Sequence, residues 1–196
     1  MLNNFLFNVE YGTNHVLDIN AYDHVLFLIV LTLPYLFKDA KRIFMLVSMF
    51  TIGHSISLLL ASYNVVRINS NLVEFLIPVT IFIMAVFNVF TAGKTTRKIR
   101  TGVLFTTTLF FGLVHGLGFA REFKLFADDT QNKFILLLEF SLGIEIAQII
   151  IVFLVLFLGY ITQTVFRFSN RDWIMVVSAI VIGLTIPMLL RSPFLL

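Results

Sequence analysis

The stretch FILLLEFSLGIEIAQIIIVFLVLFLGY, residues 134–160, is a long run of mainly apolar side chains. A helix needs about 20 such residues to cross the hydrocarbon core of a bilayer, and this run exceeds that length. Its few polar members, which include Glu139, Glu145 and Gln148, therefore stand inside a segment whose composition is typical of a membrane helix. The stretch predicts an integral membrane protein built from helices.

The rest of the chain has the same character. Of its 196 residues, 59% are hydrophobic and 13% are charged, which is far from the usual composition of a soluble domain. Short polar connectors separate the apolar stretches and leave no room for a second domain. We therefore predict an all-α, polytopic helical bundle that forms a single transmembrane domain over residues 1–196, with six spans at about 22–37, 43–62, 72–91, 102–120, 134–160 and 173–190.

The N-terminal segment, residues 2–17, differs from these stretches because apolar and polar side chains alternate along it. Its pattern predicts a short amphipathic helix at the membrane interface, not a seventh span. No Lys or Arg precedes Lys38, and a secretory signal peptide begins with a cationic segment. We therefore predict no signal peptide.

The composition also limits the chemistry. The chain contains no cysteine, which excludes disulfides, thiolate catalysis and sulfur ligands. A metal site would have to use imidazole, carboxylate, amide or water. The net charge of +3 is not interpreted as nucleic-acid binding, because in a membrane protein the distribution of Lys and Arg matters more than their total.

That distribution predicts the orientation. Alternate connectors carry most of the cationic residues, namely Lys38, Lys41, Arg42, Lys94, Arg97, Lys98, Arg100, Arg167 and Arg171. The remaining connectors and the C-terminus carry Arg67, Arg121, Lys124, Lys133 and Arg191. The positive-inside rule places the first group in the cytoplasm. We expect both termini to lie outside, in the inner (plasma) membrane of a bacterium.

All four histidines lie at or inside apolar segments: His15, His24, His54 and His115. Ionisable groups at membrane depth are costly and usually face the interior of a bundle, where they serve function. At 1.5 Å per residue, His54 lies roughly 16 Å and His115 roughly 20 Å from the inner end of its span. Asp23 and His24 begin the first span at its outer end, and Glu145 lies about 16 Å inward along the fifth. These residues therefore share one height.

The neighbours of these residues are small or polar. Gly112 and Gly116 form a G-x-x-x-G pair, which permits close contact between membrane helices. In the fifth span Glu145 and Gln148 share one helix face, whereas Glu139 points about 120° away from Glu145.

Imidazole nitrogens suit nickel, zinc, copper and iron, and a carboxylate can complete the shell or orient a liganding imidazole. We therefore predict a divalent transition-metal site with His15, His24, His54, His115, Asp23 and Glu145 as candidate ligands. The alternative is that these groups only form hydrogen bonds between helices and stabilise the bundle.

Four motifs in this order resemble a known family. They are DHVLFL after an upstream histidine, FTIGHSISLLLA, FFGLVHGLGFA and LEFSLGIEIAQ. The chain resembles, from about His15 to Val152, the HupE/UreJ family of small polytopic membrane proteins. That family is associated with nickel-dependent hydrogenase and urease systems and is regarded as a nickel or cobalt permease or accessory family. The resemblance implies nickel or cobalt as the ion and assigns Asp23, His24, His54, His115 and Glu145 to its motifs.

Two functions of different classes remain open at this point. The first is a metal-binding permease whose partners are the ion and the lipid bilayer. The second is an intramembrane metal-dependent hydrolase with a three-histidine site and a carboxylate base, either Asp23 or Glu145. A non-catalytic subunit that binds an unidentified partner protein is a weaker third. His15 and Asp18 could form a lid, an entry ligand pair or helix caps.

Overall fold

The computed structural model describes residues 2–66, 69–93, 101–127 and 132–194. Within these ranges the chain is helical and contains no strand, which confirms the predicted all-α class. The elements are α1 (Leu2–Leu17), α2 (Asp23–Thr32), the 3-10 turn η1 (Phe37–Asp39), α3 (Ala40–Ser62), α4 (Ser70–Thr91), α5 (Thr101–Phe126), α6 (Lys133–Thr164) and α7 (Asn170–Leu190).

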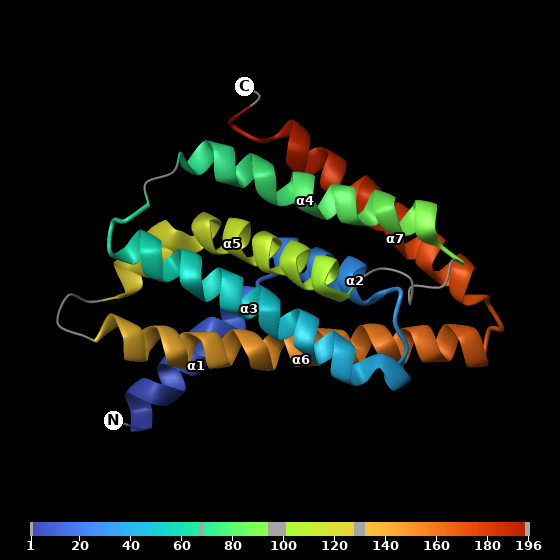
Figure 1. The fold of residues 1–196 in the computed structure, drawn as a ribbon, viewed down its shortest axis with the longest axis horizontal. Coiled ribbons are helices and arrows are strands. Elements are labelled where there is room, and N and C mark those ends of the chain that lie inside the picture. The colour runs from blue at the N-terminus through green and yellow to red at the C-terminus, as the bar shows by residue number, and fades with distance from the viewer. Residues whose placement is uncertain (1, 67–68, 94–100, 128–131, 195–196) are drawn as a thin grey trace.

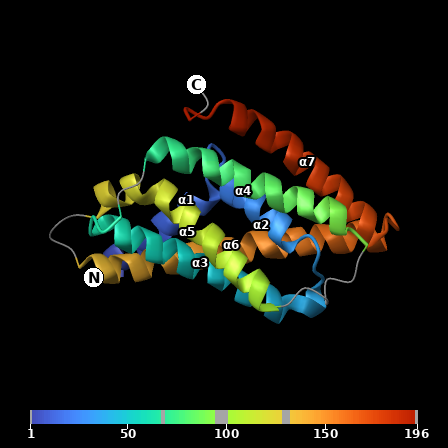
Figure 2. The ribbon, with the colours of Figure 1, turned by 45° about the horizontal axis from the view of Figure 1, so that its top comes forward.

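The long helices run roughly along one common axis (Figure 1). Helices α3 and α5 lie side by side, and α4 packs against α5. Helix α6 packs against α3, and α1 packs against α6. The short helix α2 contacts both α4 and α6, so it lies inside the bundle. Helix α7 contacts mainly α4 and forms one outer edge of the molecule (Figure 2).

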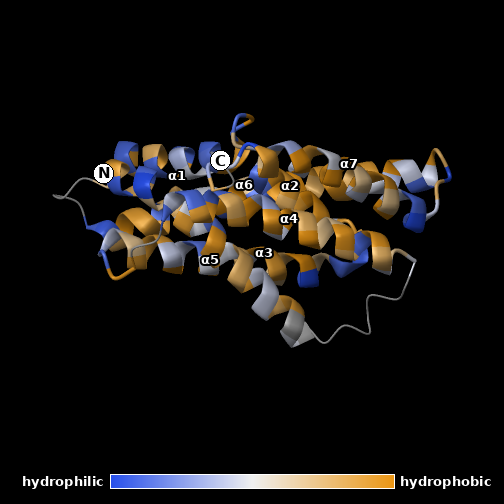
Figure 3. Cartoon of the chain, turned by 90° about the horizontal axis from the view of Figure 1, so that it is seen from above, coloured by the Kyte–Doolittle hydropathy of each residue, from blue (hydrophilic) through white to orange (hydrophobic). Residues whose placement is uncertain are grey.

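Hydrophobic residues predominate along the middle of the helices in Figure 3, and many of them are exposed on the outside of the bundle. Helix α6 shows this most clearly, because Leu138, Leu142, Phe153 and Leu158 are all about half exposed. Exposed apolar side chains at this density are what a helix presents to lipid tails. Together with the lengths of the helices, this surface identifies an integral membrane protein.

The number of predicted spans is wrong. Among the described residues, four helical segments are long and apolar enough to cross a membrane: Phe37–Ser62, Ser70–Thr91, Lys133–Thr164 and Asn170–Leu190. The predicted first span contains only α2, whose ten residues measure about 15 Å, half of a hydrocarbon core. The predicted fourth span lies in α5, which is long but diluted by threonine, glycine and His115 and is not among the four.

Helix α2 is short for an identifiable reason. Pro34 has no N–H and cannot donate to the carbonyl of Val30 four residues earlier, so the helix cannot continue through it. The side chain of Asn88 on α4 donates to that carbonyl instead, at 2.6 Å. Asn88 is 2% exposed and thus fixes the C-terminal end of α2 against α4.

The helix also breaks between α1 and α2. The carboxylate of Asp18 accepts hydrogen bonds from the backbone and the side chain of Asn20, at 2.9 and 3.1 Å, and closes a turn at this point. Asx turns of this kind offer the backbone an alternative to helix. Residues 18–21 are exposed, while the helices on either side enter the bundle. The last turn of α1 and the first turn of α2 are therefore brought together.

Glycines allow two pairs of helices to touch at the backbone. A β-carbon at Gly112 of α5 would collide with the carbonyl of Phe50 on α3, and one at Gly116 would collide with the carbonyl of His54. This contact confirms the close packing predicted from the G-x-x-x-G pair. Gly12 of α1 meets α6 in the same way, at the carbonyl of Phe140, so the predicted amphipathic segment is a helix packed on α6.

The structure describes only some of the cationic connectors on which the predicted orientation rests. The start of α3, with Lys41 and Arg42, lies at the same end of the bundle as the turn between α6 and α7, with Arg167 and Arg171 (Figure 1). The group Lys94, Arg97, Lys98 and Arg100, together with Arg67, lies outside the described residues.

Candidate metal centre

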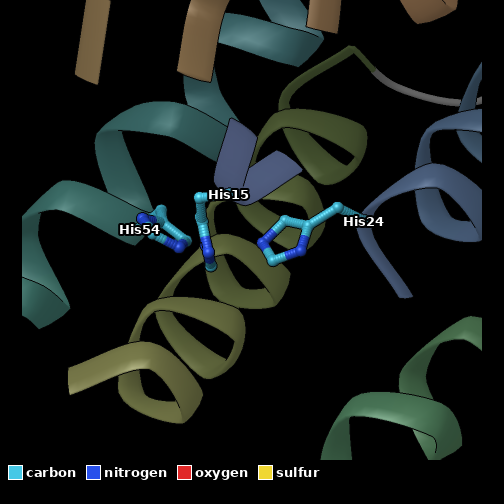
Figure 4. Close-up of side chains that lie close together, drawn as sticks. All are labelled: His15, His24 and His54. Carbon is cyan, nitrogen blue, oxygen red and sulfur yellow. The ribbon is translucent and has the colours of Figure 1, made fainter. Parts of the chain in front are cut away.

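Three histidines from three helices meet inside the bundle. His15 comes from the last turn of α1, His24 from the first turn of α2, and His54 from the middle of α3. Each offers one ring nitrogen, and these nitrogens lie within 4.8 Å of one another. His15 lies between the other two rings, whose nitrogens turn towards it (Figure 4). The break between α1 and α2 is what brings His15 and His24 to the same place.

The fourth histidine lies beside this group. The ring centroid of His115 on α5 is 5.3 Å from that of His24, and its side chain is 1% exposed. Its position follows from the glycine contacts, because Gly112 and Gly116 bring α5 against the turn of α3 that carries His54. The predicted convergence of four histidines is therefore present in the structure.

The hydrogen bonds of two rings fix which nitrogen is free. Nδ1 of His24 lies 3.0 Å from Oδ1 of Asp23, and Nδ1 of His115 lies 2.9 Å from the carbonyl oxygen of Phe111. A carbonyl oxygen can only accept, and an ionised carboxylate likewise, so Nδ1 carries the proton in both rings. The lone pair of each ring then lies on Nε2, the form in which imidazole binds a metal.

Most of the remaining ring nitrogens have no hydrogen-bond partner among the described residues. Within the described part of the chain, buried nitrogens without a hydrogen bond include Nε2 of His15, His24 and His115 and both nitrogens of His54. His24 is 4% and His54 0% exposed. Leaving buried polar atoms unpaired costs about 1–3 kcal/mol each, so a concentration of them at one point favours a bound ligand as their function.

Aromatic rings surround the histidines. The ring of Phe119 lies 3.7 Å from that of His15, and Phe140 stacks on Phe119 at 5.5 Å. On the other side Phe27 and Phe50 approach His115, at 5.2 and 5.1 Å. These rings form an apolar wall, which strengthens any bond between a cation and the imidazoles because it excludes water.

The carboxylates divide into two groups. Asp23 is placed behind His24, away from the other rings, as an acceptor for its Nδ1. Glu145 accepts hydrogen bonds from Ser48 and, at 2.6 Å, from Thr51, which also donates to Gln148 at 2.9 Å. The structure thus places Glu145 in a polar network between α3 and α6, and it is not part of the His15, His24 and His54 group.

Glu139 lies in neither group. Its carboxylate accepts a hydrogen bond of 2.6 Å from Asn8 and ties α6 to α1. The sequence interpretation did not recognise Ser48 and Thr51 as partners of Glu145. Their spacing of three residues places them on one face of α3, and that spacing is the signal that could have found them.

Two openings flank the histidines. One cavity of about 470 Å³ is lined by Tyr11, Asn14, His15, Leu17, Asp18, Ile19 and Phe119. A second, of about 200 Å³, is lined by Asp23, Glu74, Ile77, Pro78, Met188, Arg191, Ser192 and Pro193. The first reaches His15 directly, and the second reaches His24 through its partner Asp23.

The chain was compared with protein families, curated proteins and solved structures. A family model described as HupE / UreJ protein matches residues 1–191, which is almost the whole chain. No curated protein and no solved structure matches it.

Proposed function

The chain belongs to the HupE/UreJ family, and we propose from this membership and from the geometry of its histidines that it is a nickel/cobalt-type permease that binds a divalent metal ion as its substrate. The observation that carries the proposal is the meeting of His15, His24 and His54 inside an apolar bundle, each with a buried nitrogen that has no protein partner.

The ligand set follows from the free nitrogens. Nε2 of His24 and a nitrogen each of His15 and His54 would bind the ion, with Nε2 of His115 as the fourth donor. Around one ion with bonds of about 2.1 Å, tetrahedral nitrogens lie about 3.4 Å apart. The separations of up to 4.8 Å among His15, His24 and His54 would therefore shorten by up to about 1.4 Å as the ion binds, which side-chain rotation can provide. Nitrogen donors suit nickel and cobalt, and zinc or iron as well.

Asp23 acts through His24. A carboxylate behind a liganding imidazole holds the ring in one orientation and raises the basicity of its other nitrogen. Its hydrogen bond to Nδ1 assigns Asp23 this positioning role. Glu145 is engaged by Ser48 and Thr51 and is not part of the proposed ligand set.

The hydrogen bonds also favour a permease over a hydrolase. A metal-dependent hydrolase needs a carboxylate that can take a proton from metal-bound water. Both oxygens of Glu145 accept hydrogen bonds from hydroxyl groups, and Asp23 contacts Nδ1 of His24, not the Nε2 edge of the ring that would hold the metal. The arrangement suits binding and release of an ion better than hydrolysis.

The orientation completes the proposal. We place the end of the bundle that carries Lys41, Arg42, Arg167 and Arg171 in the cytoplasm, because cationic residues accumulate there. The membrane would be the inner membrane of a bacterium, with both termini outside, and residues 1–196 would act as one domain.

Uptake of Ni²⁺ or Co²⁺ into proteoliposomes tests transport. The protein should accumulate the ion under an imposed gradient, and the variant His54→Gln should lose most of this uptake while remaining monodisperse in detergent. Binding of the ion without accumulation under any gradient would contradict the permease and leave a binding or accessory role.

A further inference from the structure

Of the four clustered histidines, only His15 is within reach of solvent. His24, His54 and His115 are 4%, 0% and 1% exposed, whereas His15 is partly buried. His15 is also the only one of the four that lines the larger opening, the cavity of about 470 Å³. An ion that arrives through this cavity therefore meets His15 before it meets any other histidine.

The ring of His15 belongs to the cavity wall and to the histidine cluster at once. Its Nε2 is buried and has no hydrogen-bond partner in the described part of the chain, although the residue lines the cavity. Its ring centroid is 4.6 Å from that of His24 and 5.6 Å from that of His54, and it lies between those two rings (Figure 4). A buried imidazole nitrogen without a partner at this boundary is a suitable first ligand for the ion.

Phe119 closes the boundary between the cavity and the cluster. Its ring centroid lies 3.7 Å from that of His15, which is van der Waals contact and leaves no space for an ion between the two rings. Phe119 lines the same cavity, and Phe140 supports it with a ring that is nearly parallel at 5.5 Å. An ion reaches the cluster by this route only after one of the two contacting rings has turned aside.

The smaller opening does not lead to the free nitrogens. It meets the cluster only at Asp23, which contacts Nδ1 of His24, whereas the free nitrogen of that ring is Nε2. The proposed orientation places the start of α5 on the cytoplasmic side. Phe119 lies about 27 Å along this helix, so the larger cavity is on the outer side of the bundle, where an ion to be taken up arrives.

We infer that the ion enters the cluster through the larger opening, with His15 as its first ligand and Phe119 as the side chain that gates its passage to His24 and His54. This inference rests on the proposed function, because it concerns the loading of the same site. His15 passes the ion inward by rotating about its side-chain bonds, a motion that needs no movement of the helices.

Phe119→Leu tests the gate. A smaller and more flexible side chain eases passage in both directions, so the association and dissociation rate constants for Ni²⁺ should both rise about three- to tenfold. Their ratio, the dissociation constant, should stay within about threefold of the wild type, whereas a purely structural role would not move both rates in parallel. Stopped-flow mixing with a Ni²⁺-sensitive indicator measures association, and mixing with excess chelator measures dissociation.

Phe27→Leu is the matched control for the gate. The ring of Phe27 also lies against a histidine, at 5.2 Å from His115, but Phe27 does not line the cavity. Both of its rate constants should stay within about twofold of the wild type. Equal acceleration in Phe119→Leu and Phe27→Leu would show a general loosening of the cluster and would contradict a gate at Phe119.

Single cysteines test the opening, because the native chain contains none. Asn14 is exposed and lines the larger opening, and Glu74 is exposed and lines the smaller one. Asn14→Cys and Glu74→Cys would each be capped either with a thiomethyl group or with a bulky pyrene maleimide, so that no free thiol binds Ni²⁺. At position 14 the bulky cap should lower the association rate constant at least about tenfold relative to the small cap. At position 74 the two caps should give the same rate.

Several outcomes would overturn the inference. Equal rates for the two caps on Asn14→Cys, or a slower rate with the bulky cap on Glu74→Cys, would place the entrance elsewhere. Bound Ni²⁺ at saturation should be the same with both caps, and its loss with the bulky cap would contradict a blocked entrance. If the wild type binds no Ni²⁺, the proposed function itself fails. That result is distinct from normal binding at rates that neither the caps nor Phe119→Leu change.

Discussion

Oδ1 of Asp23 lies 3.0 Å from Nδ1 of His24 and accepts a hydrogen bond from it, which leaves the lone pair of the His24 ring on Nε2. The two residues are adjacent in sequence, and the same oxygen also accepts the backbone N–H of His24, at 2.8 Å. The first turn of α2 therefore fixes one ligand of the proposed ion before any other helix contributes.

The first prediction concerns this pair. Asp23→Asn removes the charge that orients His24 and should weaken Ni²⁺ binding about 10- to 100-fold. Equilibrium titration with a competing chelator measures the dissociation constant. Loss of this orientation should increase the dissociation rate of the ion. An unchanged dissociation constant would show that Asp23 does not support the site.

The second prediction concerns the contact between α3 and α5. A methyl group at Gly112 would meet the carbonyl of Phe50 and force the helices apart, which separates His54 from His115. Gly112→Ala should destabilise the protein by about 1–3 kcal/mol and weaken metal binding. Thermal unfolding in detergent and metal titration measure the two effects.

Gly102→Ala on the same helix is the matched control, because a β-carbon there meets nothing within 4 Å. It should change neither quantity. Equal stability of the two variants would contradict the close packing of α3 on α5.

The third prediction is that Glu145 does not bind the ion. Glu145→Gln should leave the dissociation constant for Ni²⁺ within about twofold of the wild type, because this carboxylate is not among the proposed ligands. It should destabilise the bundle by roughly 0.5–2 kcal/mol through its hydrogen bonds to Ser48 and Thr51. Loss of bound metal in a folded Glu145→Gln variant would return Glu145 to the ligand set.

Much of the fold could be predicted because the length of an apolar stretch can be read directly from the local sequence. Residues 134–160 are helical as expected, within α6, which extends from Lys133 to Thr164. The prediction of a span at residues 22–37 was wrong because the apolar sequence continues through Pro34, whereas the helix ends at Thr32. The carbonyl that Pro34 leaves free is bonded by Asn88, 58 residues away, and no local pattern reveals that contact.

The sequence predicted the depth of the site residues in the membrane but not the direction in which their side chains point. Counting residues along the helices placed His54, His115 and Glu145 at similar depth, and the histidines do meet. Which way a side chain faces depends on the rotation of each helix, which is set by packing. Glu145 faces Ser48 and Thr51 for this reason. His15 joins the cluster because the turn at Asp18 brings the last turn of α1 next to the first turn of α2, a result of one local hydrogen-bonded turn.

The measurement that tests the central claim most directly is the metal content of purified protein after equilibration with Ni²⁺, by elemental analysis. We predict about one ion per chain for the wild type, near zero for His54→Ala and His54→Gln, and at least a tenfold weaker affinity for His115→Ala. Glu145→Gln should retain the wild-type content, and size-exclusion chromatography confirms that each variant is folded. Equal, near-zero metal in the wild type and in every histidine variant would contradict the metal site.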